Sequence, residues 1–186
     1  MDSYELLRAA GWYPGRRVDT APGEQALIAA GYRLHGAAIA VLAEFSGLTI
    51  TGPEFYVEGR IGRLRCRHQL WVDGERAAVE SESPVACIDY SEAVGDTLVP
   101  VAGEPPTTTF MIGEHGAVWG AFSDSYAFSA NSFIEAVAVI LVPSDEKRPP
   151  PLMLPFDSAE ILRQRRLEEE RLKQQRGWRR FWGRGR

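Results

Sequence analysis

Four side chains of the types that bind zinc occur in the chain: Cys66, His68, Cys87 and His115. Cys66 and His68 stand two residues apart, so they would share one face of a strand, and the other two could complete a tetrahedral site. Zinc motifs usually show tighter paired spacing, however, and this thiol and imidazole alternate with leucines as core residues do. We therefore predict no metal site, and we expect both cysteines to be buried and reduced.

Residue types that support hydrolysis are also present, but in no catalytic arrangement. Ser123-Asp124-Ser125 lacks the Gly-x-Ser-x-Gly elbow that exposes a nucleophile, and nothing places a histidine beside a serine. Glu80, Glu82 and Asp89 could act as a carboxylate pair with a helper, although clustered acids more often form a solvated face. Neither of the two common phosphate-binding glycine patterns occurs. We predict that the protein is not an enzyme and needs no cofactor.

The chain has 186 residues, of which 45% are hydrophobic and 25% are charged, as in an ordinary globular protein. This length predicts one domain with an appendage, and a body of roughly 150 residues can bury about 70% of its unfolded surface. No apolar run approaches the ~20 residues of a membrane span, and the acidic start lacks a signal-peptide core. We therefore expect a cytoplasmic protein.

The most regular stretch, 110–142, predicts a β-hairpin followed by a helix. Two apolar segments flank a short glycine-bounded loop at 113–116. From Phe133 the apolar residues recur at helical spacing, Ser132 can cap the helix, and Pro143 ends it. The apolar sides of this unit must be covered by earlier elements.

The earlier part of the chain supplies helices first and strands afterwards. Glycines end three helical patterns in the first third, and apolar residues alternate with arginines along 64–72. These patterns predict an α+β fold in which N-terminal helices pack on an antiparallel β-sheet with a closing helix. Expected in the middle are a strand at 48–51 ended by Gly52-Pro53, a strand at 64–72, a turn at Asp73-Gly74, an unassigned segment at 75–86 and a short helix at 89–94.

Charge divides the chain into a body and a tail. Residues 1–156 carry 20 acidic and 11 basic side chains, a net charge of −9, whereas residues 157–186 carry 5 acidic and 10 basic, a net charge of +5. We predict a domain over 1–143, a proline-rich linker over 144–156, and a C-terminal amphipathic tail helix over 157–186. This basic, aromatic tail could contact anionic membrane or nucleic acid, dock on the acidic body, or simply stay solvated.

The opening of the chain carries a family resemblance. The run LLRAAGWYPGRRVD at 6–19 resembles the first motif of the third branch of the SUKH superfamily of bacterial immunity proteins. Segments at 45–48, 90–95, 98–101 and 110–119 resemble later parts of that family in the same order, and the resemblance runs from about Leu6 to Leu141. Val72-Asp73-Gly74 departs from the Phe-Asp-Pro of relatives. The characteristic residues of the opening motif are Gly11, Trp12, Pro14, Gly15, Arg16 and Asp19.

Trp12 and Arg16 have two interpretations. A tryptophan beside arginines could anchor a partner. The alternative, which we favour, is that the ring wedges under neighbouring helices while the guanidinium binds carbonyls at a helix end. The motif would then specify the fold rather than the binding site.

The resemblance implies a binding protein whose partner is a cognate secreted toxin, commonly a nuclease or a nucleic-acid deaminase. An acidic body would attract such a basic partner, and the acids we expect at the contact are Glu80, Glu82, Asp89, Glu92 and Asp96. Two alternatives stay open: these acids could serve solubility while an apolar groove binds, or the protein could be a regulatory scaffold localised by its tail.

Overall fold

The structure, a computed structural model, describes residues 2–59, 62–81, 83–105, 108–122, 125–143 and 152–153. All of them belong to the first of two units, Met1–Leu154 and Pro155–Arg186, into which the chain divides. The predicted tail helix at 157–186 lies outside the described residues, as does most of the predicted linker.

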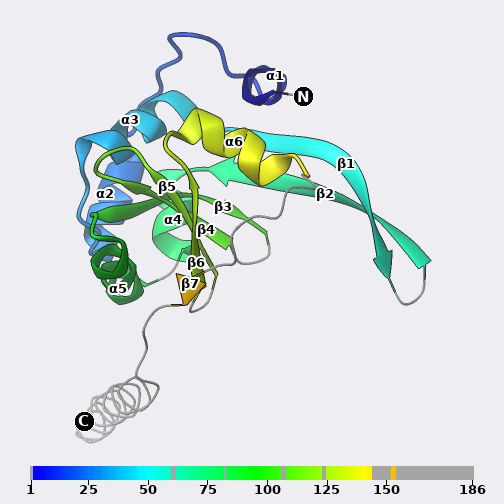
Figure 1. The fold of residues 1–186 in the computed structure, drawn as a ribbon. Coiled ribbons are helices and arrows are strands. Elements are labelled where there is room, and N and C mark those ends of the chain that lie inside the picture. Colours follow the sequence, from blue (N-terminus) through cyan, green and yellow to red (C-terminus); the bar gives the residue numbers. More distant parts are fainter. Residues whose placement is uncertain are drawn as a thin grey trace, which may run out of the picture. The chain divides into compact units, whose positions relative to one another are not determined.

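One antiparallel sheet organises the described residues, and its strands lie in chain order (Figure 1). Each strand pairs with its neighbours in sequence, so the sheet is a continuous meander into which helices are inserted. The short last strand falls inside the predicted linker and pairs with the strand before it. The strands are β1 (Thr49–Gly59), β2 (Gly62–Val72), β3 (Leu98–Glu104), β4 (Thr108–Gly113), β5 (Val118–Phe122), β6 (Ser125–Ala130) and β7 (Leu152–Met153).

The helices pack on both faces of this sheet, and an α+β class with a closing helix is confirmed. On one face α3 and α6 meet side chains such as Ile112. On the other face Cys87 of α5 contacts Met111, and Arg76 of α4 lies over Trp71. The helices are α1 (Ser3–Ala9), α2 (Ala21–Ala30), α3 (Gly36–Phe45), α4 (Gly74–Glu80), α5 (Pro84–Val94) and α6 (Phe133–Leu141).

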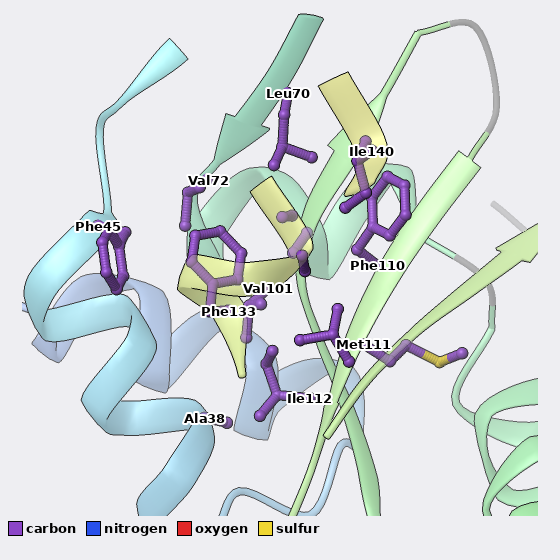
Figure 2. Close-up of a cluster of buried hydrophobic side chains, with 14 of the residues drawn as sticks. Ala38, Phe45, Leu70, Val72, Val101, Phe110, Met111, Ile112, Phe133 and Ile140 are labelled. Atoms are coloured by element: carbon purple, nitrogen blue, oxygen red, sulfur yellow. The ribbon is translucent and has the colours of Figure 1, made fainter. Parts of the chain in front are cut away.

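The core on the first face is built around Phe133 (Figure 2). Its ring lies 4.8 Å from that of Phe45, between centroids, and thereby joins α6 to α3. Phe133 and Leu141 are both buried, as the helical spacing predicted. Ser132 caps α6 by accepting a hydrogen bond from the backbone N–H of Glu135 at 3.3 Å.

The outer halves of β1 and β2 form an arm, residues 54–59 and 62–67, that projects from the body (Figure 1). β2 pairs with β3 only at Trp71 and Val72, so in the described part of the chain the arm is a two-stranded ribbon. Leu64, predicted to face the core, is exposed there, and Cys66 is only half-buried. The prediction of a buried Cys66 is therefore wrong, because periodicity shows which face a residue shares and not whether anything covers that face.

Each face of the arm has its own chemistry. Cross-strand partners share a face, so the pairing of Val57 with Leu64 and of Phe55 with Cys66 makes one face apolar. The opposite face carries Glu54, which binds the guanidinium groups of Arg65 and Arg67. Charges on this face are thus largely compensated within the arm.

Two expectations in the middle of the chain are wrong. β1 does not end at Gly52-Pro53; a bulge between Thr51 and Glu54 absorbs these residues, and an added Cβ at Gly52 would lie 2.3 Å from the carbonyl oxygen of Leu141. Gly52 is therefore required by the end of α6 rather than by a turn.

The expected turn at Asp73-Gly74 is instead a helix start. Asp73 caps α4 by accepting from the backbone N–H of Arg76 at 2.8 Å, and Ser83 caps α5 in the same way through Ala86 at 3.2 Å. The unassigned segment at 75–86 therefore contains α4 and the start of α5, five residues before the predicted Asp89.

The position of Phe133 predicts a large loss of stability on truncation. Phe133→Ala should lower the free energy of unfolding by about 3–5 kcal/mol, because it leaves a cavity between α3, α6 and the sheet. Val139→Ala on the outer side of the same helix is the control and should change it by less than about 1 kcal/mol. Urea denaturation measures both, and equal midpoints for the two variants would contradict this account of the core.

Candidate partner-binding site

A groove of about 440 Å³ lies along α5. Its walls come from the end of α2, one side of α5, the turn into β3 and the loop between β4 and β5. Two of the predicted acids, Glu92 and Asp96, line it. Glu114 of the hairpin loop and Arg33 after α2 also line it, and the sequence had not singled out either, because only the folded sheet brings them beside α5.

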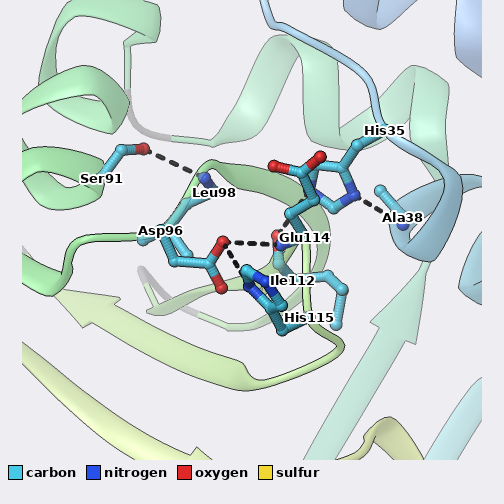
Figure 3. Close-up of polar contacts among 8 residues, drawn as sticks. All are labelled: His35, Ala38, Ser91, Asp96, Leu98, Ile112, Glu114 and His115. Carbon is cyan, nitrogen blue, oxygen red and sulfur yellow. Dashed lines mark hydrogen bonds and ion pairs between the residues drawn. The ribbon is translucent and has the colours of Figure 1, made fainter.

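Asp96 holds the floor of this groove in place (Figure 3). Its Oδ1 accepts a hydrogen bond from the backbone N–H of Glu114 at 3.0 Å and lies 3.4 Å from Nδ1 of His115. Nearby, Ser91 Oγ accepts from the backbone N–H of Leu98 at 3.0 Å and donates to the carbonyl of Cys87 at 2.6 Å. Asp96 is thus engaged in fixing the hairpin loop and is poorly placed to serve as a free contact.

The remaining predicted acids differ in exposure and in whether another side chain pairs with them. Glu92 is exposed, whereas Glu80 pairs with Arg76 of the same helix, the closest N–O distance being 2.7 Å. Burial raises the pKa of the Asp89 carboxyl, and the neighbouring charge of Glu92 raises it further. Glu82 lies outside the described residues. The surface of α4 and α5 therefore presents acids at several points rather than one catalytic pair.

The signature residues lie elsewhere, and none of them lines the groove. Trp12 is buried and donates from Nε1 to a carboxylate oxygen of Glu44 at 3.0 Å. Arg16 donates to the carbonyls of Glu44 and Ser46 at 2.6 and 2.7 Å, at the end of α3. Gly11 and Gly15 have φ of +95° and +80°, Pro14 is exposed, and Asp19 accepts from the backbone N–H of Ala21.

One polar anchor near the groove was missed from the sequence. His35 caps α3 by accepting at Nδ1 from the backbone N–H of Ala38 at 3.2 Å (Figure 3). Its Nε2 lies 3.1 Å from the carbonyl of Ile112, to which it donates in this tautomer. Its position directly before a helix is a cap signal. Its contact with the carbonyl of Ile112 in β4 could not be predicted, because the two residues are 77 positions apart in sequence.

The zinc-type side chains do not converge. Cys66 lies on the arm, while His68 stacks on Phe55 and pairs with Glu104. Cys87 is buried against the carbonyl of Leu98 and the sulfur of Met111. Among the described residues, no group of three or more His, Cys, Asp or Glu is arranged to hold a metal ion. Ser123 and Asp124 lie outside the described residues.

A family model described as SUKH-3 immunity protein matches residues 2–142. The chain belongs to the SUKH-3 immunity protein family. The match covers every described element except β7 and confirms the resemblance stated from the opening motif and the later segments. No curated protein and no solved structure matches the chain.

Within the described part of this SUKH-3 chain, no helix is long and apolar enough to cross a membrane. The expected contact of the tail with membrane or nucleic acid concerns residues outside the described part of the chain.

The two thiols of this SUKH-3 domain should differ in reactivity. Burial raises the pKa of Cys87 from its ordinary 9.0 to about 12, so Cys87 stays protonated and inert at pH 8, whereas half-buried Cys66 should react. An aromatic disulfide reagent should titrate one thiol in the native protein and both in denaturant. Cys66→Ser should abolish the native reaction; a rapid reaction remaining in that variant would contradict the burial of Cys87.

The raised pKa of Cys87 in the folded protein also predicts that stability falls as pH rises above 9.0, because the thiol then ionises in the unfolded chain but not in the folded one.

The contacts of Arg16 predict that lysine cannot replace it. Arg16→Lys removes the fork that reaches two carbonyls and should lower the free energy of unfolding by about 1–3 kcal/mol. Arg17→Lys, next to it and exposed, is the matched control and should change stability by less than about 0.5 kcal/mol. If toxin binding is lost in Arg16→Lys while the unfolding curve is unchanged, the signature is a binding site after all.

Proposed function

We propose that this SUKH-3 protein is a non-catalytic immunity protein that acts in the cytoplasm by binding a cognate polymorphic toxin, either a nuclease or a nucleic-acid deaminase. Family membership supports the class of partner. The observation that carries the proposal is the charge of residues 74–96, which contain six acidic residues and one arginine. That arginine, Arg76, is engaged by Glu80 and by the ring of Trp71.

The physical argument is charge complementarity. An enzyme that acts on nucleic acid must hold phosphate, and lysine and arginine supply most of that affinity. An acidic protein surface attracts the same basic region and can raise the association rate by roughly 10- to 1,000-fold at low salt. Once seated, a domain of this size would block entry of nucleic acid without any chemistry of its own.

The direct test is survival. We expect a toxin gene beside the gene for this chain. Cells that express that toxin alone should die, and co-expression of the wild-type chain should rescue them. Purified wild-type chain should also bind a catalytically inactive form of that toxin. Absence of both rescue and binding would refute the proposed function.

The role of charge is tested by matched pairs of neutral variants. E80Q/E92Q removes two charges from α4 and α5, whereas E58Q/E135Q removes two exposed charges from the arm and α6. Asp96 is left unchanged because it holds the hairpin loop. We expect E80Q/E92Q to slow association with the inactive toxin roughly threefold to tenfold at low ionic strength and to flatten its salt dependence. Equal effects of the two pairs would mean that the acids act only through net charge.

A further inference from the structure

One side of the arm has no strand partner, because β3 pairs with only the inner end of β2. The two strands pair at Trp71 and Val72, and β3 ends at Glu104. The next residue, Pro105, has no backbone N–H with which to continue the ladder. β2 continues into the arm, and among the described residues no strand pairs with residues 63–67 on the side away from β1 (Figure 1). We call that side of residues 63–67 the open edge.

The backbone groups that point toward the open edge follow from neighbouring hydrogen bonds. Val72 donates its backbone N–H to Leu48, on the β1 side, at 3.0 Å. Asp73 instead donates to Val101 of β3 at 3.1 Å. Successive residues of a strand point their backbone groups to opposite sides, and the bulge at 52–53 adds its extra residue to β1 and not to β2. Every second residue of β2 therefore points its N–H and C=O toward the open edge: Arg63, Arg65 and Arg67.

The outer edges of β1 and β2 are protected differently. An edge strand attracts further strands unless proline, a bulge or charge prevents it. The edge of β1 carries the bulge at Pro53, whereas β2, in the described part of the chain, has neither proline nor bulge. A second copy is disfavoured on the open edge, because two β2 edges meeting antiparallel would set arginine against arginine. The open edge therefore suits a strand of another sequence.

The two faces of the arm define the side chains that such a strand should carry. On one face Val57 and Leu64 are cross-strand partners and are 46% and 50% exposed, so apolar side chains beside them would cover them. On the other face a single carboxylate, that of Glu54, binds both Arg65 and Arg67. Each guanidinium has five N–H donors and can bind a further carboxylate. The fitting strand therefore alternates apolar and acidic residues.

A third strand would also stabilise the arm. A two-stranded ribbon is marginally stable in water, whereas three strands with an apolar face can hold together. The open edge has the length of an ordinary strand, about five residues. Main-chain hydrogen bonds along it would supply affinity, and the side chains on the two faces would supply specificity.

We propose that the cognate toxin adds a β-strand of alternating apolar and acidic residues to the open edge of β2. This inference rests on the proposed function and gives it a second contact, distinct from the acidic surface of α4 and α5. A toxin that is basic where it holds phosphate can carry such a strand elsewhere on its surface.

Hydrogen exchange, followed by NMR on the full chain, tests strand addition directly. The probe is the catalytically inactive form of the toxin expected beside the gene. We expect the amides of Arg63, Arg65 and Arg67 to exchange at least about tenfold more slowly in the complex, because each gains a hydrogen bond. The amides of Leu64 and Cys66 point toward β1 and should change less. Contact through side chains alone would not produce this alternation.

Substitutions at one cross-strand pair separate the backbone from the charge. R65P removes the N–H at the open edge, where proline is tolerated because that N–H is not bonded to β1. R65Q removes the same charge and keeps the N–H. Y56P is the matched control, since Tyr56 is the cross-strand partner of Arg65 and points its N–H to the outer edge of β1. We expect R65P to weaken toxin binding roughly tenfold or more, R65Q roughly threefold and Y56P less than about twofold.

The outcomes are distinguishable. Alternating protection, with weaker binding by R65P than by R65Q, supports the added strand; thermal melts check each variant, and if R65P does not fold, the exchange pattern decides. Equal weakening by R65P and R65Q without protection means that the arginines act through charge alone, which overturns the inference. Weakening by Y56P alone places the contact on β1 and also overturns it.

The remaining outcomes concern the occupant. Protection that appears in the free chain as its concentration rises would make a second copy the occupant and overturn the inference. If the wild type binds the toxin and rescues cells while exchange along the open edge is unchanged, the added strand is overturned and the immunity function stands. Failure of the wild type both to bind and to rescue overturns both proposals.

Discussion

Two hydrogen bonds from Arg16 close the carboxyl end of α3, and the entry of the chain into the sheet depends on them. The last carbonyls of a helix have no partner within it and carry a partial negative charge, so a guanidinium satisfies both needs. Immediately afterwards Gly47 donates to the carbonyl of Val72, which starts the pairing of β1 with β2. Gly47 has φ of +80°, a conformation that strains any side chain.

Contacts between aromatic rings connect the end of α3 to the core. Trp12 stacks near Phe45, with 6.4 Å between centroids, and Phe45 in turn contacts Phe133. The opening motif thus supports α3, α3 supports α6, and α6 covers the sheet. This arrangement explains in physical terms how a short motif far from the groove can identify the whole domain.

Periodicity was sufficient to predict the elements whose partners are local. The β4–β5 hairpin and α6 follow from their own spacing, and glycine limits α2 and α3 as expected. Periodicity failed where contacts between residues far apart in the sequence determine the structure. Gly52 looked like a terminator but makes room for Leu141, and Asp73 looked like a turn residue but caps a helix of only seven residues.

The candidate site, like the fold, could be predicted only in part from the sequence. Its acids could be predicted because most of them follow one another along 80–96, whereas the role of Asp96 depends on a partner 18 residues away.

The arm exposes long strand edges, and such edges invite other strands to extend the sheet. In the described part of the chain, β1 is the outermost strand and β2 is unpaired on one side over most of its length. Two β1 edges meeting antiparallel about Tyr56 would set Glu54 against Glu58, and two β2 edges would set arginine against arginine. A meeting of unlike edges would gain little, since these charges already pair within each arm, and the bulge at Pro53 interrupts the ladder. The like charges along these edges therefore disfavour antiparallel pairing of two copies through the arm in these registers.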